Sequence, residues 1–263
     1  MIDISNAKKE FKKLLDKYNS KEKPGFNLKI THTYHVMENA KKIACRLELS
    51  EEDIELAELI ALLHDIGRFE ELMKYDKFDS VNNDHAQVGI KMLFDDNLIR
   101  KFIKTEEHDE IIKKAILNHN KLRIEDKLEK RSLLHAKIIR DADKLDNYRV
   151  KKEEKIESIF PNIVKTKEQL EHSKISKNVY QSILNKQCVD IHDRKTPLDY
   201  WCCVLAFLFD LNFKESFKIM KDNNYINICI DRLNYKNKDS KDKMNNIRNI
   251  MNTYIEEKIK EWH

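Results

Sequence analysis

A histidine followed directly by an aspartate, His64-Asp65, ends the apolar segment LIALLHDIGRF. The segment is apolar on nearly all faces of a helix, so both side chains are expected at the edge of a hydrophobic core. A charged carboxylate in such a place is costly unless a cation compensates it. The pair can therefore supply two ligands of a metal site. The equally open alternative is that the two residues only cap the end of a helix.

Other histidines and aspartates stand in similar segments, each on a helix face that also carries apolar residues. An all-helical fold would point them toward a shared interior. Imidazole and carboxylate without thiolate favour divalent ions such as Mn, Fe, Co, Ni or Mg. The residues are His32, His85, His119 and Asp143.

The elements that must position these residues are predicted to be helices. Apolar spacing predicts a first helix over about 5–18, ended by Pro24-Gly25, and a second over about 31–47, which places His32 at its start. Ser50 is predicted as the N-cap of a third helix that continues to His64 and stops at Gly67. Further helices are predicted from Asp84 and Asp109 as N-caps, over 132–148, and after Pro161 through 236–260.

The composition supports an all-α fold. Glycine and proline number three each, whereas average usage gives about 18 and 13 in a chain of this length. Extended β architectures and doubly wound α/β sheets need more turn residues than this. No window holds the glycines of a phosphate-binding loop either. Any phosphate chemistry must therefore rely on metal ions and basic side chains.

The charge and cysteine content indicate a cytoplasmic protein without a nucleic-acid or membrane partner. Lys+Arg 50 against Asp+Glu 46 leaves a net charge of +4, with both signs mixed along the helices. The five cysteines lack any CxxC pair and are interpreted as reduced, buried thiols. The N-terminus has no apolar signal core, and the longest apolar run, Tyr200–Phe209, is about half the roughly 20 residues that span a bilayer.

The ordered histidine and aspartate series is similar to the H…HD…H…H…D signature of the HD-domain superfamily of metal-dependent phosphohydrolases. The short segments HTYHVMENA, LLHDIGRF and RDADKLD resemble that superfamily too. The resemblance covers about residues 28–150. The stretch HDIGRFEELMKYDKFDSVNNDHAQVG resembles a bacterial branch of uncharacterised HD hydrolases, and the similarity continues through DRKTPLDYWCCVLAFLFDLNF.

This resemblance implies a single all-α domain over 1–263, an HD helical bundle with additional C-terminal helices. Its metal-binding core covers about 28–150 and its helical extension about 156–263. The charged stretch 151–155, followed by Pro161, is a weak candidate for a domain boundary. It fits a loop within one bundle equally well.

The resemblance also implies a role for each member of the series. One divalent ion is held in the family at the positions of His32, His64, Asp65 and Asp143. Asp65 is placed to bridge a second ion, which two-metal members hold at the positions of His85 and His119. His35 stands where the family has an arginine before a valine, which favours a substrate-facing or supporting role for it.

Phosphoryl transfer would also need basic side chains to stabilise the negative charge that develops on the equatorial phosphoryl oxygens. Arg68 follows the HD pair and Lys144 follows Asp143, so these two join Asp65 as catalytic candidates, with a solvated surface role as the alternative for both. Weaker candidates are Lys121, Arg140, Arg149 and Arg194. His135 is a candidate support for Asp143, with a packed or exposed histidine as the alternative.

The implied activity is hydrolysis of a phosphate ester or anhydride in a small metabolite, with nucleotides favoured. The absence of a GYP motif after Asp143 argues against cyclic-di-GMP phosphodiesterases. IGRFEE replaces the paired carboxylates of ppGpp hydrolases, although DADKLDNYR resembles their segment, so an alarmone hydrolase stays open but is not favoured. A mixed-valent di-iron oxygenase, which uses the same ligand order, is one alternative. A regulatory module that keeps a metal for structure is another. The oligomeric state is left open.

Overall fold

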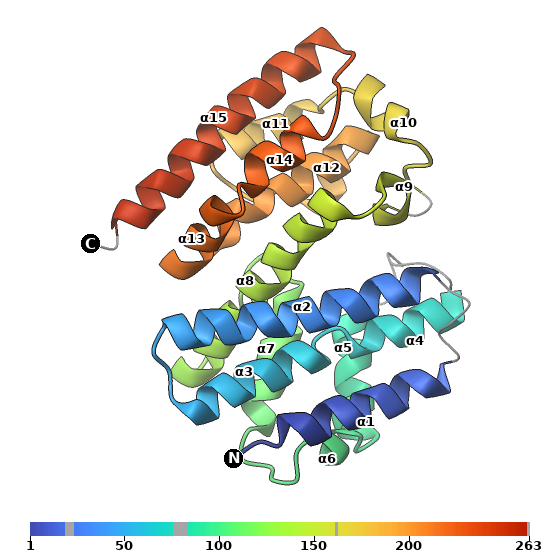
Figure 1. Cartoon of the computed structure of the whole chain (residues 1–263), viewed down its shortest axis with the longest axis vertical. Helices are drawn as coiled ribbons and strands as arrows, with labels where there is room; N and C mark the ends of the chain where they lie inside the picture. The colour runs from blue at the N-terminus through green and yellow to red at the C-terminus, as the bar shows by residue number, and fades with distance from the viewer. Residues whose placement is uncertain (19–23, 76–83, 161–162, 262–263) are drawn as a thin grey trace. The chain divides into compact units, whose positions relative to one another are not determined.

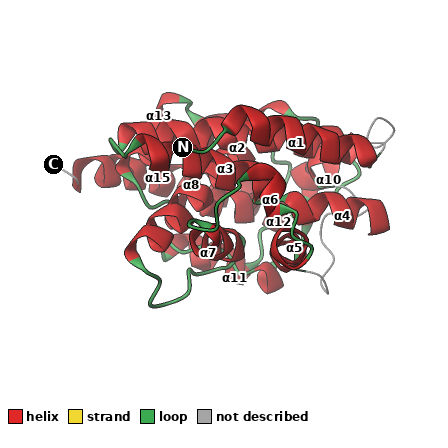
Figure 2. Cartoon of the chain, turned by 90° about the horizontal axis from the view of Figure 1, so that it is seen from below, coloured by secondary structure: helices red, strands yellow, loops and turns green. Residues whose placement is uncertain are grey.

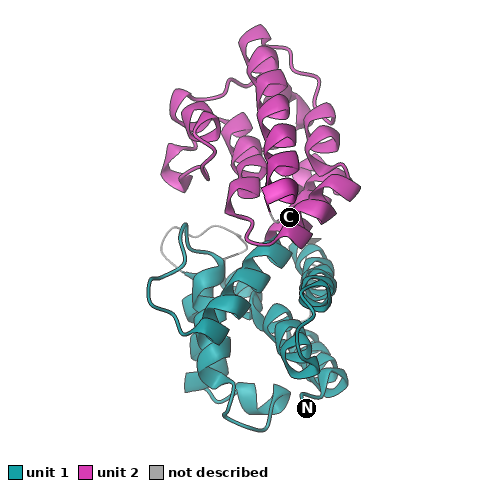
Figure 3. Cartoon of the chain, turned by 90° about the vertical axis from the view of Figure 1, so that its left-hand side faces the viewer, with its two compact units in different colours: residues 1–143 teal, residues 144–263 magenta. Residues whose placement is uncertain are grey.

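The computed structural model describes residues 1–18, 24–75, 84–160 and 163–261, and within them every regular element is a helix (Figure 2). The predicted all-α class is therefore confirmed. The chain divides into two compact units, 1–143 and 144–263 (Figure 3). The division falls inside a long helix, α8 (Lys130–Glu153), and not at the charged stretch 151–155. Pro161 lies outside the described residues.

The first unit contains the helices that carry the histidine and aspartate series (Figure 1). Its elements before α8 are α1 (Ile4–Lys17), α2 (Pro24–Arg46), α3 (Glu51–Leu63), α4 (Ile66–Tyr75), α5 (His85–Ile90), the π-helical turn η2 (Lys91–Asp95), α6 (Ile99–Phe102) and α7 (Asp109–His119).

The start of α2 differs from the sequence prediction. Pro24-Gly25 was expected to end the first helix, but α1 ends at Lys17 and Pro24 is the first residue of α2. Proline suits the first helical position because the N–H that it lacks would have no partner there. His32 consequently lies well inside α2, and not at the start of a helix.

Helix α3 is the buried centre of the first unit. Ser50 caps it as predicted, with its Oγ accepting a hydrogen bond from the backbone N–H of Asp53 at 3.2 Å. Every residue from Leu56 to Leu63 is buried, and α3 packs along α2. A helix that is apolar on all sides can only be stable inside a core, so its C-terminal end delivers His64 directly into the interior.

Gly67 does not stop this helix, contrary to the sequence prediction. Helix α3 ends at Leu63, α4 begins at Ile66, and the φ of Gly67 is not positive. A Cβ at Gly67 would lie 2.1 Å from the carbonyl oxygen of His85 and 2.7 Å from the backbone nitrogen of Gly89. The missing side chain therefore allows α4 and α5 to cross at backbone contact, beside the HD pair.

Aromatic packing joins the first helices to α4. The Phe69 ring lies 5.8 Å from that of Phe11 and 5.7 Å from that of Phe26, centroid to centroid, and all three rings are fully buried. Such aromatic pairs add to the burial of apolar area. They fix α1, α2 and α4 around the end of α3.

Asp84 and Asp109 begin their helices differently. Asp84 caps α5 as predicted, accepting a hydrogen bond from the backbone N–H of Ala86 at 3.0 Å. Asp109 is the first residue of α7 and not its N-cap, which is His108. The prediction was off by one residue because the Asp109 carboxylate binds the Arg100 guanidinium and no backbone N–H of its own helix.

The second unit is also helical. Its elements after α8 are α9 (Ile156–Ile159), α10 (Lys167–His172), α11 (Lys177–Leu184), the 3₁₀ turn η3 (Ile191–Asp193), α12 (Pro197–Leu205), the 3₁₀ turn η4 (Ala206–Asp210), α13 (Lys214–Asp222), α14 (Tyr225–Asp231) and α15 (Lys238–Glu261). Trp201 on α12 is fully buried, so the apolar run around it belongs to the core.

The five cysteines form no disulfide bond within the described part of the chain, as predicted, but not all of them are buried. Cys202, Cys203 and Cys229 are buried in the second unit, whereas Cys188 is half-buried and Cys45 is exposed on α2. Among the described residues, no helix has both the length and the apolar character that a membrane span requires.

Candidate metal centre

Six side chains of the predicted series meet inside the first unit from helices far apart in the sequence. Five of them are buried, and the side chain of Asp143 is 20% exposed. His32 lies on α2, His64 and Asp65 join α3 to α4, His85 begins α5, His119 ends α7, and Asp143 lies on α8.

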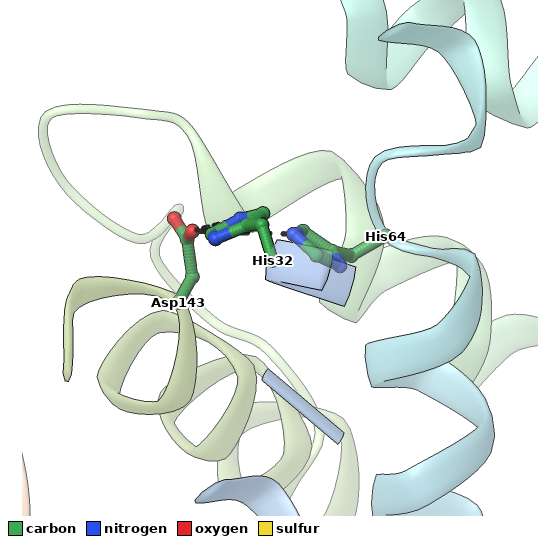
Figure 4. Close-up of side chains that lie close together, drawn as sticks. All are labelled: His32, His64 and Asp143. Carbon is green, nitrogen blue, oxygen red and sulfur yellow. Dashed lines mark ion pairs between the residues drawn. The ribbon is translucent and has the colours of Figure 1, made fainter. Parts of the chain in front are cut away.

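The first group consists of His32, His64 and Asp143, which point toward one another (Figure 4). The Nε2 of His32 lies 3.1 Å from Oδ1 of Asp143, and the Nε2 of His64 lies 4.0 Å from the same oxygen. One atom from each side chain lies within 4.8 Å of the others. The three donor atoms therefore surround one small volume.

The second group consists of His85 and His119. Their Nε2 atoms are 3.1 Å apart, and the His119 ring packs edge-on against that of His64, with centroids 5.1 Å apart. His85 reaches this place because Gly67 and Gly89 let α5 approach α4 closely. The second group thus depends on the crossing of these two helices.

Asp65 lies between the two groups and offers a different oxygen to each. Its Oδ2 is 3.7 Å from the Nε2 of His32 and 3.5 Å from that of His64. Its Oδ1 is 3.3 Å from the Nε2 of His85 and 3.6 Å from that of His119. One carboxylate therefore contributes to both groups at once.

Backbone carbonyls orient two of the imidazoles. The Nδ1 of His64 is 2.7 Å from the carbonyl oxygen of Ala61, and the Nδ1 of His119 is 2.6 Å from that of Ile116. A carbonyl only accepts, so each Nδ1 must carry the proton and donate it. In the neutral imidazoles the Nε2 lone pairs then point into the site, as metal ligation requires.

Burial and charge set the ionisation of the group members. Burial lowers the pKa of His64 to about 4, and burial together with the Arg68 charge holds the pKa of His85 well below its usual value. Burial opposes the charge on Asp65, but the Lys29 ammonium and nearby histidines hold the pKa of this carboxyl well below normal. At neutral pH His64 and His85 are therefore neutral while Asp65 is ionised, which is the form in which they bind metal.

The family model of the HD domain matches residues 30–148, a range that contains all six side chains. Residues 30–148 of this chain belong to the HD-domain superfamily. The predicted resemblance is thereby confirmed at the level of the superfamily. Neither the search of the curated proteins nor that of the solved structures found a match. HD domains bind divalent metals and are typical of metal-dependent hydrolases.

The donors of this HD domain fit a divalent ion. The Nε2 of His64 is buried and has no hydrogen-bond partner among the described residues. Leaving such an atom unsatisfied is costly unless a ligand binds it. The atoms of His64, Asp65 and His119 also lie within 4.8 Å of one another. Imidazole and carboxylate without thiolate suit ions of the Mn, Fe, Co, Ni and Mg class.

Sequence reasoning missed two neighbours of the candidate site, Lys29, which contacts Asp65, and Glu71, which contacts Arg68. The Nζ of Lys29 lies 2.5 Å from Oδ2 of Asp65. Glu71 is 2% exposed and accepts a hydrogen bond at 2.9 Å from Arg68. A helical reading of α2 from Pro24 would have revealed Lys29, because residues three apart share a helix face and Lys29 precedes His32 by three.

The two predicted basic residues differ in their surroundings. Arg68 lies beside the HD pair, with its Nε 3.9 Å from Oδ1 of Asp65. Lys144 is buried in the second unit, where its Nζ binds the Asp210 carboxylate at 2.8 Å and lies 5.7 Å from the centre of the Phe207 ring. The Lys144 ammonium is therefore engaged with a carboxylate of the second unit, whereas Arg68 lies beside Asp65.

The weaker candidates have partners of their own. Lys121 pairs with Glu125, Arg149 with Asp146, and Arg194 lies over the ring of Tyr200. His135 binds Oδ1 of Asp53 at 3.0 Å, at the opposite end of α3 from the HD pair. His35 is 40% exposed and lies 3.4 Å from the Glu38 carboxylate.

Arg140 is a buried cap for the end of α7 and not a surface residue. Its guanidinium is 1% exposed and donates to the carbonyl oxygens of Asn118 and Lys121, both at 2.6 Å. The last carbonyls of a helix lack intrahelical donors. Arg140 supplies them and so anchors the helix end that presents His119.

Replacing Arg140 with methionine is therefore expected to destabilise the first unit by about 2–4 kcal/mol, because buried carbonyls lose charged donors. Thermal unfolding followed by circular dichroism measures the loss. Arg140→Lys should recover only part of it, since one ammonium cannot reproduce the planar fork of donors. A wild-type melting temperature for Arg140→Met would contradict the capping role.

Proposed function

We propose that this protein is a metal-dependent phosphohydrolase that cleaves a phosphate ester or anhydride of a small metabolite. The observation that carries the proposal is the position of Asp65, whose two oxygens each face a different histidine group. This arrangement suits a carboxylate shared by two ions. The first would be held by His32, His64, Asp65 and Asp143, and the second by Asp65, His85 and His119.

Different side chains of the site would have different roles in the reaction. When bound, divalent ions supply Lewis-acid attraction for phosphoryl oxygens and lower the pKa of water at the site. Asp65 holds the two groups in register, and the backbone carbonyls of Ala61 and Ile116 hold the imidazoles of His64 and His119. The Arg68 guanidinium, fixed by Glu71, provides positive charge for the phosphoryl oxygens in the transition state.

A nucleotide is the substrate class that we favour, with manganese among the candidate ions and a cytoplasmic location. Five cysteines that form no disulfide bond among the described residues support a reducing compartment. Lys144 remains a catalytic candidate, but its ion pair with Asp210 favours a role in holding α8.

The test compares two buried histidines of the first unit. Metal content is measured in the purified protein and after reconstitution with Mn²⁺ or Co²⁺, and phosphate release is measured over nucleotides, sugar phosphates and pyrophosphate. His64→Gln should lose bound metal and hydrolysis, because it removes the Nε2 donor that His64 contributes to the first group. His135→Gln, which removes a histidine that binds Asp53, should keep both. Absence of bound metal in the reconstituted wild type would refute the proposal.

The same purified protein distinguishes the phosphohydrolase from the di-iron oxygenase alternative. An oxygenase purified in air would contain iron with an electron paramagnetic resonance signal and would consume dioxygen. Phosphate release that is equal with and without air would favour the phosphohydrolase.

A further inference from the structure

The Lys29 ammonium lies against the Asp65 carboxylate oxygen that faces the first histidine group. Its Nζ lies 2.5 Å from Oδ2 of Asp65, the oxygen that also faces His32 and His64. The Lys29 side chain is 19% exposed and that of Asp65 is 4% exposed. An ammonium from the protein itself thus lies where the carboxylate would meet a metal ion.

The contact has a clear electrostatic reason. A buried carboxylate without a counter-charge is strongly destabilising, and Lys29 supplies that charge. A divalent ion in the first group would use the same oxygen and would repel the ammonium at such short range. The ion and Lys29 would therefore compete for Oδ2.

We propose that Lys29 is a tethered cation that competes with the divalent ion for Asp65. It stabilises the site while metal is absent, and it weakens metal binding because the ion must displace it. Its long side chain and partial exposure let the ammonium move to solvent when the ion binds. The inference rests on the proposed metal site and adds a residue that sets its affinity.

The same helix offers a matched control. Lys41 also lies on α2, and its Nζ binds the buried Glu58 of α3 at 3.0 Å. No member of either histidine group takes part in that pair. Lys41→Met therefore removes an α2 lysine and its pair with a buried carboxylate without touching the metal centre.

The experiment measures the affinity of the full chain for Mn²⁺ by isothermal titration calorimetry and its melting temperature in EDTA. We expect Lys29→Met to bind Mn²⁺ at least about fivefold more tightly than wild type, the lower end of typical couplings between two bound ligands. We also expect it to melt several degrees lower in EDTA and to recover on addition of Mn²⁺. Lys29→Arg keeps the charge and should bind the ion much as wild type does.

Lys41→Met should also lower the melting temperature, because it leaves the buried Glu58 carboxylate without its counter-charge. It should not change the Mn²⁺ affinity, and its stability should not recover on addition of Mn²⁺. If Lys29→Met unfolds in EDTA but folds with Mn²⁺, the inference is supported; if it does not fold in either condition, Lys29→Gln is measured in its place. Equal or weaker Mn²⁺ binding by the neutral variant overturns the role of Lys29. If wild type itself binds no divalent ion, the proposed function fails instead, so the two failures are distinguishable.

Discussion

Replacement of Asp65 with asparagine is expected to abolish metal binding and hydrolysis together while leaving the chain folded. The amide has nearly the same shape but no charge, so it can no longer offer an anionic oxygen to each histidine group. Loss of a partner that only supports a ligand costs about 10–100-fold in metal affinity. Loss of the shared carboxylate itself should cost more than that, and hydrolysis should fall by about 10³-fold or more.

The metal-free form of the Asp65→Asn variant should remain close to wild type in stability. The change removes a buried charge, and the Lys29 ammonium that loses its partner is partly exposed and can reach water. The melting temperature in EDTA measures this, whereas metal content and phosphate release report on the site.

Asp53→Asn is the matched control for this prediction. Asp53 also belongs to the α3 region and binds a histidine, His135, together with Arg131. It lies at the other end of the helix, so its variant should keep bound metal and hydrolysis. Asp65→Asn with a full complement of metal and wild-type turnover would remove Asp65 from the centre.

Replacement of Gly67 with alanine is expected to disrupt the site from outside the ligand set. The new Cβ would lie 2.1 Å from the His85 carbonyl oxygen and 2.7 Å from the nitrogen of Gly89. Both are backbone atoms, so the helices α4 and α5 must separate. Overpacking of this kind costs about 3 kcal/mol or more, against a helix-propensity gain of about 1 kcal/mol for alanine.

We therefore expect Gly67→Ala to lower the melting temperature on the order of 10 °C. It should also weaken metal binding, because His85 moves away from Oδ1 of Asp65. Calorimetry and metal analysis check the two effects separately.

Gly89→Ala provides the comparison. Its Cβ would lie 3.2 Å from the Ile66 side chain, which can shift, and 3.4 Å from the nearest backbone atom. This variant should be only mildly destabilised and should retain its metal. Equal stability of Gly67→Ala and wild type would show that the α4–α5 crossing tolerates a side chain.

Much of the fold could be predicted because its signals are local. Apolar spacing and capping residues located α1, α3 and α5, since a cap is decided by a few neighbouring residues. The start of α2 was misplaced because proline marks the beginning of a helix as well as a break. That error left Lys29 in a presumed loop, away from His32.

The role of the glycines could not be predicted from their neighbours in the sequence. Gly67 beside the HD pair resembles a helix stop, yet its role is set by the backbone of α5, which is distant in the sequence. Likewise, Arg140 looks like one basic residue among many, and only the position of the α7 end makes it a cap. Contacts between separate helices have no signature in the spacing of one helix.

The sequence by itself determined the helical class, the order of the six candidate ligands and the superfamily to which they belong, because these depend on residue types and local periodicity. The tertiary structure alone decided which oxygen of Asp65 faces which histidines, that Lys29 binds one of them and that Lys144 binds Asp210. The physical reason is that a carboxylate buried among several helices takes its partners from whichever side chains the packing brings within reach.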